Sequence, residues 1–359
     1  MAFPALSPAR PIRVLIVDDS AFMRRAIERL LTSHQGVTVV GQAADGMEAV
    51  RKALELRPDV ITMDVEMPRM DGVSAVVEIM QTIPTPIVMV STLTQEGTAT
   101  AIRALEAGAV ECVGKPSGLS TDLVNVGEKL YEAVHRASLA RLARRRPVAL
   151  PAAAPGPAER PPARAPAPPA RHVVVIGSST GGPPALTQVV PHLPAGLNAA
   201  VVVVQHMPPS FTGALARRLD GLSRLPVNEA AEGDLLAAGR VLVAPGDYHL
   251  IVGKDRRVRL DRGPTVHGVR PSVDVTLFSV AEVFGSAVSV AILTGMGRDG
   301  ADGAARVEAA GGQVFTQDEA TSVVYGMPRV TMERTKHAKQ LPIDRIAGAL
   351  AASVPGWQR

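Results

Sequence analysis

The sequence predicts an α/β protein made of two doubly wound parallel-sheet domains joined by a linker. Its 359 residues exceed the usual size of one domain. Short apolar, β-prone runs alternate with helical patterns both before and after a segment rich in Pro, Ala and Arg. These observations predict four parts: a disordered N-terminus over residues 1–11, a first domain over 12–136, a flexible linker over 137–171 and a second domain over 172–359.

The linker explains the basic charge of the chain. Residues 137–171 contain seven arginines and one glutamate, while nine prolines and nine alanines lie between Pro147 and Arg171. Such a composition buries no core and favours an extended, solvated chain. The whole chain has a net charge of +4, so the residues outside the linker carry −2. Solvated arginines are therefore favoured over nucleic-acid or acidic-partner binding, and a DNA-binding output domain is disfavoured.

Composition also bounds the cellular setting. No apolar run approaches the roughly 20 residues that a membrane span needs, and the N-terminus has no signal-peptide core. The single cysteine, Cys112, excludes an intrachain disulfide and is typical of a reducing compartment. We expect a soluble, monomeric, cytoplasmic protein without direct membrane insertion.

Polar residues follow the predicted strands of the first domain. The strands are expected at Ile12–Val17, Val37–Val40, Val60–Met63, Ile87–Val90 and Val110–Val113. Asp18, Asp19, Asp64, Ser91 and Lys115 come directly after four of them. Because ligands bind at the carboxyl ends of strands in open α/β sheets, these side chains should converge.

The chemistry of this polar set is consistent. Three crowded carboxylates repel one another unless a hard cation such as Mg²⁺ joins them. A carboxylate held there can attack a phosphoryl group, while Lys115 pairs with the added charge and Ser91 donates a hydrogen bond. Taken singly, Asp18 or Asp19 is more often a helix N-cap than a metal ligand.

Residues 12–136 resemble a response-regulator receiver domain, which has a flavodoxin-like fold. The resemblance is carried by V-D-D-S (17–20), M-D-V-E-M-P (63–68), M-V-S-T (89–92) and K-P (115–116). It implies Asp64 as the phosphoacceptor, with Mg²⁺ held by Asp18, Asp19, Asp64 and the Glu66 carbonyl. It also implies that Ser91 and Lys115 sense the phosphoryl group and that Pro116 follows a cis peptide bond. Cys112 stands where many receivers carry an aromatic switch residue.

In the second domain, three chemically useful side chains follow three apolar runs. Ser179 is the central serine of a G-x-S-x-G pattern within His172–Gly182, where a β-prone run ends in small residues. His206 follows the run 199–205, and Asp299 lies in the glycine-rich segment 294–303 that follows 287–293. If these strands are parallel, a nucleophile, a base and an orienting acid meet at one edge.

Each of these residues also has a structural interpretation. Ser178, Ser179 or Thr180 could cap a helix, His206 could satisfy a carbonyl, and Asp299 could cap a helix beginning near Ala301. G-S-S-T-G-G lacks the pattern and lysine of phosphate-binding loops. The chain order Ser–His–Asp differs from that of α/β-hydrolases, although triads recur by geometry and not by order.

Residues 172–359 resemble the catalytic domain of the chemotaxis protein-glutamate methylesterases (CheB family), with a Rossmann-like α/β fold. The motifs are I-G-S-S-T-G-G (176–182), Q-H-M-P-P (205–209), A-P-G-D (244–247), R-P-S-V-D (270–274), I-L-T-G-M-G-R-D-G (292–300) and V-V-Y-G-M-P (323–328). The resemblance implies Ser179 as nucleophile, His206 as general base and Asp299 as third member. It implies oxyanion support from the Met296 N–H and Thr180. Arg298 and the run Val266–Val269 depart from the family pattern.

The resemblance also implies a function. A phosphorylation-activated enzyme would demethylate glutamate methyl esters on methyl-accepting chemotaxis receptors, and deamidate selected glutamines, without a cofactor for ester hydrolysis. Its phosphodonor would be a chemotaxis histidine kinase. A flexible linker of this length reaches on the order of 30 Å, so the receiver could dock over Ser179 until Asp64 is phosphorylated. A signalling array outside chemotaxis and a non-catalytic binding module remain as alternatives.

Overall fold

The chain divides into two compact units, residues 1–148 and 149–359, each described here by itself. The computed structural model describes residues 10–92, 94–115, 120–141 and 168–356. The expectations for residues 1–9, for Pro116 and for the greater part of the linker lie outside these residues. No helix among them is long and apolar enough to cross a membrane.

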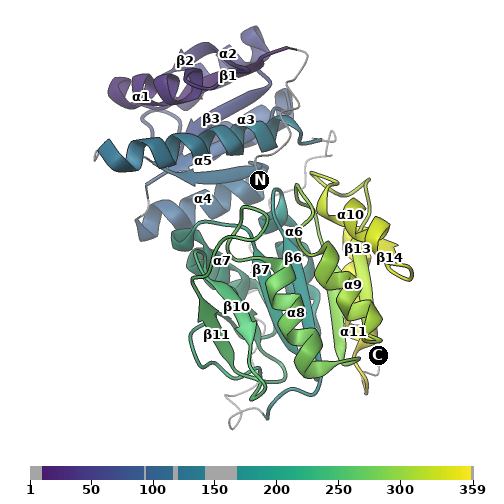
Figure 1. Ribbon diagram of the computed structural model, residues 1–359. Coiled ribbons are helices and arrows are strands. Elements are labelled where there is room, and N and C mark those ends of the chain that lie inside the picture. The colour runs from purple at the N-terminus through teal and green to yellow at the C-terminus, as the bar shows by residue number, and fades with distance from the viewer. Residues whose placement is uncertain (1–9, 93, 116–119, 142–167, 357–359) are drawn as a thin grey trace. The chain divides into compact units, whose positions relative to one another are not determined.

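The first unit is a parallel five-stranded sheet in the order β2-β1-β3-β4-β5 (Figure 1). Its elements are β1 (Ile12–Val17), α1 (Ala21–Thr32), β2 (Val37–Ala43), α2 (Gly46–Leu56), β3 (Val60–Asp64), α3 (Gly72–Thr82), β4 (Ile87–Ser91), α4 (Gln95–Ala107), β5 (Glu111–Gly114) and α5 (Ser120–Ser138). All residues of β3 and β4 are buried, as expected for central strands covered by helices on both faces. The predicted strand–helix alternation is confirmed, with β2 three residues longer than expected.

Ser20 caps helix α1, so the N-cap interpretation of Asp18 and Asp19 is wrong. Ser20 Oγ accepts a hydrogen bond from the Met23 N–H, while Asp18 Oδ1 accepts one from the Ser20 N–H. The serine satisfies the helix N-terminus, which leaves both aspartates at the carboxyl end of β1.

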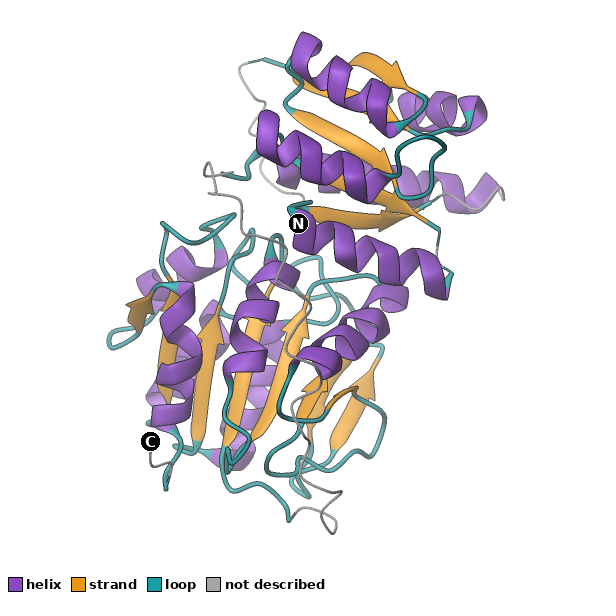
Figure 2. Ribbon diagram, turned by 180° about the vertical axis from the view of Figure 1, so that it is seen from behind, coloured by secondary structure: helices purple, strands orange, loops and turns teal. Residues whose placement is uncertain are grey.

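The second unit is a seven-stranded parallel sheet in the order β14-β13-β12-β6-β7-β9-β8, with a separate antiparallel pair β10-β11. Figure 2 shows the strands of this unit in orange, with helices in purple on both faces of the sheet. Its strands are β6 (Val173–Ser178), β7 (Ala200–Gln205), β8 (Val227–Glu229), β9 (Val241–Val243), β10 (His249–Val252), β11 (Val258–Asp261), β12 (Val288–Ile292), β13 (Gln313–Gln317) and β14 (Lys339–Leu341). Its helices are α6 (Gly182–Val189), the short 3-10 helix η1 (Val190–His192), α7 (Pro209–Leu222), α8 (Val273–Phe284), α9 (Ala301–Ala309), α10 (Met327–Arg334) and α11 (Ile343–Ser353).

The strand order reverses at β6, as in a Rossmann-like sheet. Strand β6 pairs with β7 on one side and with β12 on the other, and both pairings are parallel. A crevice forms at such a switch point because the connections on either side run in opposite directions. The segments that follow β6, β7 and β12 therefore meet at one edge, and these segments carry Ser179, His206 and Asp299.

Both ends of the predicted linker carry ordered structure. Helix α5 extends to Ser138, beyond the predicted end of the first domain. At the other end, the Ala170 N–H donates to the Leu236 carbonyl, and Ala170 lies in the core of the second unit. Residues 168–171 thus pack with the second domain, because their backbone pairs with it.

Candidate active site

Ser179 lies on a tight turn between β6 and α6 that only glycines can complete. Gly181 has φ 76°, and a Cβ there would lie 2.6 Å from the Val323 Cβ. A Cβ on Gly182 would lie 1.9 Å from Gln205 Oε1. The N-cap of α6 is Gly181, which makes no side-chain capping bond, so the capping interpretation of the preceding hydroxyl residues is wrong. The turn leaves the Ser179 hydroxyl without a hydrogen-bond partner among the described residues.

Gln205, the last residue of β7, ties the serine turn to the histidine. Its side-chain amide donates to the Ser179 carbonyl at 2.9 Å and to the His206 carbonyl at 3.0 Å. Its Oε1 accepts the Ser178 hydroxyl at 2.6 Å. The residues around it are buried, so a fully bonded amide fixes the two segments relative to each other. Sequence reasoning missed this role; the available signal was a polar residue that ends a wholly apolar strand.

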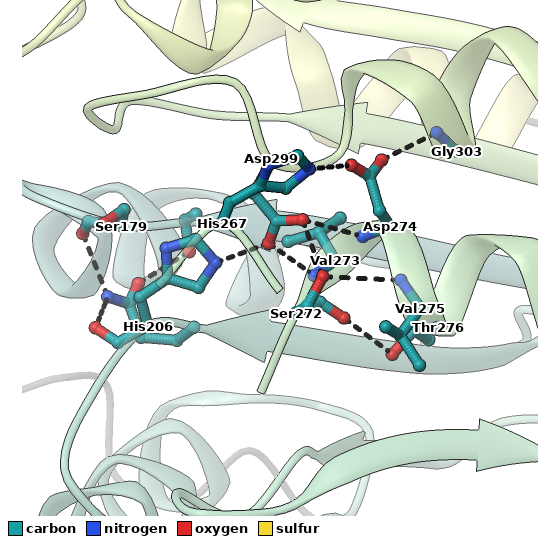
Figure 3. Close-up of polar contacts among 12 residues, drawn as sticks. Ser179, His206, His267, Ser272, Val273, Asp274, Val275, Thr276, Asp299 and Gly303 are labelled. Atoms are coloured by element: carbon teal, nitrogen blue, oxygen red, sulfur yellow. Dashed lines mark hydrogen bonds and ion pairs between the residues drawn. The ribbon is translucent and has the colours of Figure 1, made fainter. Parts of the chain in front are cut away.

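His206 and Asp299 form a short hydrogen bond. His206 Nε2 lies 2.7 Å from Asp299 Oδ2, and both side chains are nearly buried (Figure 3). Because Nε2 bonds the carboxylate, Nδ1 is the ring nitrogen left to accept a proton. His206 therefore does more than satisfy a carbonyl, contrary to its structural interpretation.

The first turn of helix α8 surrounds the Asp299 carboxylate with further donors. Oδ1 accepts the Ser272 hydroxyl at 2.7 Å and the Asp274 N–H at 3.0 Å, and Oδ2 accepts the Val273 N–H at 2.6 Å (Figure 3). Burial would raise the pKa of Asp299, but the hydrogen bonds from His206, Ser272 and this backbone outweigh it and lower the pKa to about 2. Asp299 thus bonds the N-terminus of α8. It does not cap α9, whose N-cap is Gly300.

The segment 294–300 packs directly against the serine turn. The Ser179 N–H donates to the Thr294 carbonyl, and a Cβ on Gly295 would lie 2.7 Å from the Ser179 Cβ. The Met296 N–H has no hydrogen-bond partner among the described residues, so it is available to a ligand. Thr180 is buried, and its carbonyl accepts the Thr294 hydroxyl at 2.9 Å. Arg298 is exposed and pairs with Asp302 on α9.

In the first unit, Lys115 joins two buried carboxylates at the sheet edge. Its Nζ lies 2.7 Å from Asp64 Oδ2 and 3.0 Å from Asp18 Oδ2. Burial raises the pKa of Asp64 to about 6, and the hydrogen bond and charge of Lys115 offset only part of this effect. Burial would lower the pKa of Lys115, but its two carboxylate partners raise it. The predicted convergence of these three residues is seen in the structure.

The same edge has the donor set that a divalent cation prefers. One carboxylate oxygen from each of Asp18, Asp19 and Asp64 lies within 4.8 Å of the other two. Asp18 Oδ2 is buried, and among the described residues only the Lys115 ammonium lies beside it, so the oxygen keeps a lone pair for an ion. A pocket of about 240 Å³ opens here, lined by Asp19, Asp64, Val65, Glu66, Thr92 and Lys115. An oxygen-rich pocket of this size fits Mg²⁺ with a phosphoryl group.

Ser91 is not brought to Asp64 by a hydrogen bond. Its hydroxyl donates to the Gly97 carbonyl at 3.0 Å and to the Thr92 carbonyl at 3.2 Å, so it faces the first turn of α4. Cys112 is buried in β5 beside Met89 of β4, and burial raises the pKa of its thiol. A small buried thiol thus occupies the position at which the resemblance implies an aromatic switch residue.

The two sheets together define a class of protein: a response regulator whose output domain carries a hydrolase-like Ser–His–Asp cluster. Comparison with known families agrees with this description. Residues 14–125 match the response regulator receiver domain and residues 174–350 match the CheB methylesterase domain.

Relatives match nearly the whole chain. A "Protein-glutamate methylesterase/protein-glutamine glutaminase" of Symbiobacterium thermophilum is 50% identical over 96% of this chain and 98% of its own. One of Thermotoga maritima is 45% identical over 94% of this chain and 97% of its own. The chain belongs to the CheB family of protein-glutamate methylesterases.

Solved structures match each unit separately. The Thermotoga maritima CheB methylesterase catalytic domain is 45% identical, with 51% of this chain and 98% of that chain covered and a TM-score of 0.49. The response regulator domain of Thermotoga maritima CheB is 50% identical, with 36% and 97% covered and a TM-score of 0.34.

Proposed function

We propose that this chain demethylates glutamate methyl esters on methyl-accepting chemotaxis receptors and deamidates selected receptor glutamines, under control of its receiver domain. The observation that carries the proposal is the His206–Asp299 hydrogen bond at the sheet edge where the Ser179 turn lies. Membership of the family indicates the class of reaction. The His206–Asp299 pair adds a base for that reaction, and the hydrogen bond fixes the orientation of this base.

Ser179 is proposed as the nucleophile and His206 as the general base. The Ser179 oxygen attacks the γ-carbonyl carbon of the methylated side chain, and its proton passes to His206 Nδ1. Asp299 stabilises the resulting imidazolium through Nε2, and it can do so because it is ionised at neutral pH. The support is the lowered pKa of Asp299 together with its four hydrogen-bond donors.

The Met296 N–H is proposed to stabilise the tetrahedral oxyanion. It has no partner among the described residues and belongs to the segment that packs on Ser179. Backbone donors that are already oriented cost no reorganisation when the charge develops. Thr180 is proposed to support this site because its carbonyl joins the serine turn to Thr294.

The intermediate then breaks down in two steps. His206 returns its proton to the departing methoxide, methanol leaves, and a glutamyl ester of Ser179 remains. Water activated by His206 then attacks the ester carbonyl, and glutamate and free Ser179 are formed. In deamidation the departing nitrogen must be protonated, so the same histidine acts as general acid.

Asp64 is proposed as the phosphoacceptor for a chemotaxis histidine kinase. Asp18, Asp19, Asp64 and the Glu66 carbonyl would hold Mg²⁺, which neutralises charge on the phosphoryl group when bound. Lys115 would pair with the phosphoryl oxygens, and Ser91 would leave Gly97 to donate to them. Because its substrate sites and phosphodonor face the cytoplasm in this proposal, we place the protein there.

The proposal is tested by methanol release from membranes that contain methylated receptors. We expect Ser179→Ala to lower the rate by about 10³-fold or more, because the proposed ester forms on the hydroxyl that this variant lacks. The wild-type chain and the variant are compared at equal concentration, with folding checked by circular dichroism. Equal rates would remove the catalytic proposal and favour a non-catalytic binding module.

A further inference from the structure

A second histidine–aspartate pair lies directly behind Asp299. His267 Nε2 lies 2.9 Å from Asp274 Oδ2, and Asp274 is 1% exposed (Figure 3). One side-chain atom from each of His267, Asp274 and Asp299 lies within 4.8 Å of the other two. The Asp274 N–H is itself one of the donors to Asp299. Two buried carboxylates therefore meet at the first turn of α8: Asp274 belongs to this turn, and Asp299 accepts hydrogen bonds from it. Each carboxylate also bonds a histidine.

Asp274 also joins helix α8 to helix α9. Its Oδ1 accepts the Gly303 N–H at 2.6 Å, which is in the first turn of α9. A Cβ on Gly303 would lie 2.5 Å from the Leu277 Cβ, so the two helices are in close contact there. Asp299 lies two residues before α9. The Asp274–Gly303 bond therefore fixes the segment that carries Asp299 against the donors on α8.

His267 reaches Asp274 from a two-residue hairpin turn. Val266 and Val269 exchange backbone hydrogen bonds, and His267 and Gly268 have φ angles of 54° and 78°. Positive φ at both central residues is the pattern of a type I′ turn. This turn places the imidazole within hydrogen-bond distance of Asp274.

We propose that Asp274 and His267 are positioning residues of this active site: they fix the Asp299 segment and set the charge behind the His206–Asp299 pair. The inference rests on the proposed function. Neither residue touches substrate; both act through Asp299. The negative charge of Asp274 favours the imidazolium form of His206 during the reaction, because it adds to the field of Asp299.

Other charged and titratable groups lie beside this pair on α9 and β10. On α9, Asp302 lies between Arg298 and Arg334. From β10, His249 Nδ1 accepts the Ser272 N–H, and its Nε2 bonds the Pro264 carbonyl. Burial, and after it the charge of Asp299, raises the pKa of Asp274 to about 6. Asp274 thus carries its charge at neutral pH and loses it in mild acid.

The test is the pH profile of kcat/KM for methanol release by the full chain. Asp274→Asn keeps the shape of the side chain and removes its charge. We expect kcat to fall roughly tenfold, with KM unchanged. The acidic limb of the profile should move to lower pH by about 0.5 to 1 unit, because the imidazolium loses a stabilising charge. A uniform fall at every pH, or no change, would overturn the proposal.

His267 gives a second, independent variant pair in case Asp274→Asn folds poorly. Removing the donor in His267→Ala should lower kcat several-fold, and His267→Gln should recover most of it, because its amide can donate at about the Nε2 position. The matched control is His192→Gln, at an exposed histidine on η1 whose Nδ1 bonds the Gln188 carbonyl. His267→Ala that behaves like this control contradicts the proposal.

The two proposals fail in different ways. If Ser179→Ala keeps full activity, the proposed function fails and this inference fails with it. If Ser179→Ala is inactive while Asp274→Asn and His267→Ala match the wild type in kcat and pH profile, only this inference fails.

Discussion

Asp64 and Asp299 are both buried aspartates near the carboxyl ends of parallel strands, yet their environments have opposite effects. The pKa of Asp64 is raised to about 6, whereas that of Asp299 is lowered to about 2. Asp64 receives the Val65 N–H and Lys115, while Asp299 receives a histidine, a hydroxyl and two backbone donors. The number of hydrogen-bond donors, more than burial, decides whether the pKa of each carboxyl is raised or lowered.

The difference suits the two proposed roles. A phosphoacceptor must keep lone pairs free for a phosphoryl group and a cation, so Asp64 cannot be saturated with donors. An orienting carboxylate must stay ionised and immobile, which is what four hydrogen bonds give Asp299. An aspartate thus lies at the carboxyl-end edge of each sheet, but the two proposed roles differ: one aspartate accepts a phosphoryl group, and the other orients a histidine.

The largest effect is expected when the fully bonded carboxylate is neutralised. Asp299→Asn should lower kcat for methanol release by about 10³- to 10⁴-fold, because an amide neither holds His206 in the required tautomer nor stabilises the imidazolium. The measurement is receptor demethylation by the full chain. Asp302→Asn is the matched control, since Asp302 is a carboxylate on α9 that pairs with the exposed Arg298 and Arg334. A loss below tenfold for Asp299→Asn would contradict the role given to its hydrogen bonds.

The positions of the residues proposed to react could be predicted from the sequence, because each follows an apolar run that could be recognised as a strand. Ser179, His206, Asp299 and Asp64 needed only the rule that carboxyl ends of parallel strands share an edge. The tight turn at Ser179 could also be predicted, since an abrupt change from branched residues to small ones, glycines among them, indicates such a turn.

The residues that hold these groups in place were not predictable. Ser272, Asp274 and His267 act through segments whose paths depend on how α8 packs against the strand ends, and the only sequence signal for Gln205 was a polar residue at the end of an apolar strand. The strands β8, β9 and β14 are three residues long, too short to give a periodic signal. Asp299 shows the limit most clearly. A helix N-terminus was a reasonable partner for it, but the helix is α8, which precedes it in sequence, and not the adjacent α9.

A second, smaller effect is expected on the rate of demethylation when the receiver domain is removed. We expect a fragment of residues 168–359 to demethylate receptors roughly tenfold faster than the unphosphorylated full chain, a typical size for coupling between two sites. The fragment begins at 168 because Ala170 pairs with Leu236 inside the second domain. A small phosphodonor should accelerate the full chain but not the fragment, and Asp64→Asn should abolish that acceleration. Equal rates for fragment and full chain would contradict autoinhibition by the receiver.

The smallest expected effect is on the free energy of unfolding. We expect this free energy to change in opposite directions when Asp64 and Asp299 are replaced by asparagine. The folded-state pKa of Asp64 lies above its ordinary value, so ionisation costs stability as pH rises from about 4 to 6. Asp64→Asn should therefore raise the free energy of unfolding of the first domain at pH 7 by about 1 to 2 kcal/mol. The gain should shrink as pH falls from about 6 toward 4, because the wild-type carboxyl is then increasingly protonated in the folded domain. Lys115 retains Asp18 as a partner in this variant.

Asp299→Asn should do the opposite to the second domain. Its folded-state pKa lies below the ordinary value, so its stabilisation is complete above about pH 4 and is lost as pH falls toward 2. The variant should thus lower the free energy of unfolding at pH 7 by about 1 to 2 kcal/mol. Calorimetry of the full chain at pH 7 and pH 4.5 assigns each change to a domain by the transition that moves. If both variants shifted the free energy of unfolding in the same direction, burial alone would explain the pKa shifts of the two aspartates. The number of hydrogen-bond donors would then not account for the difference between them.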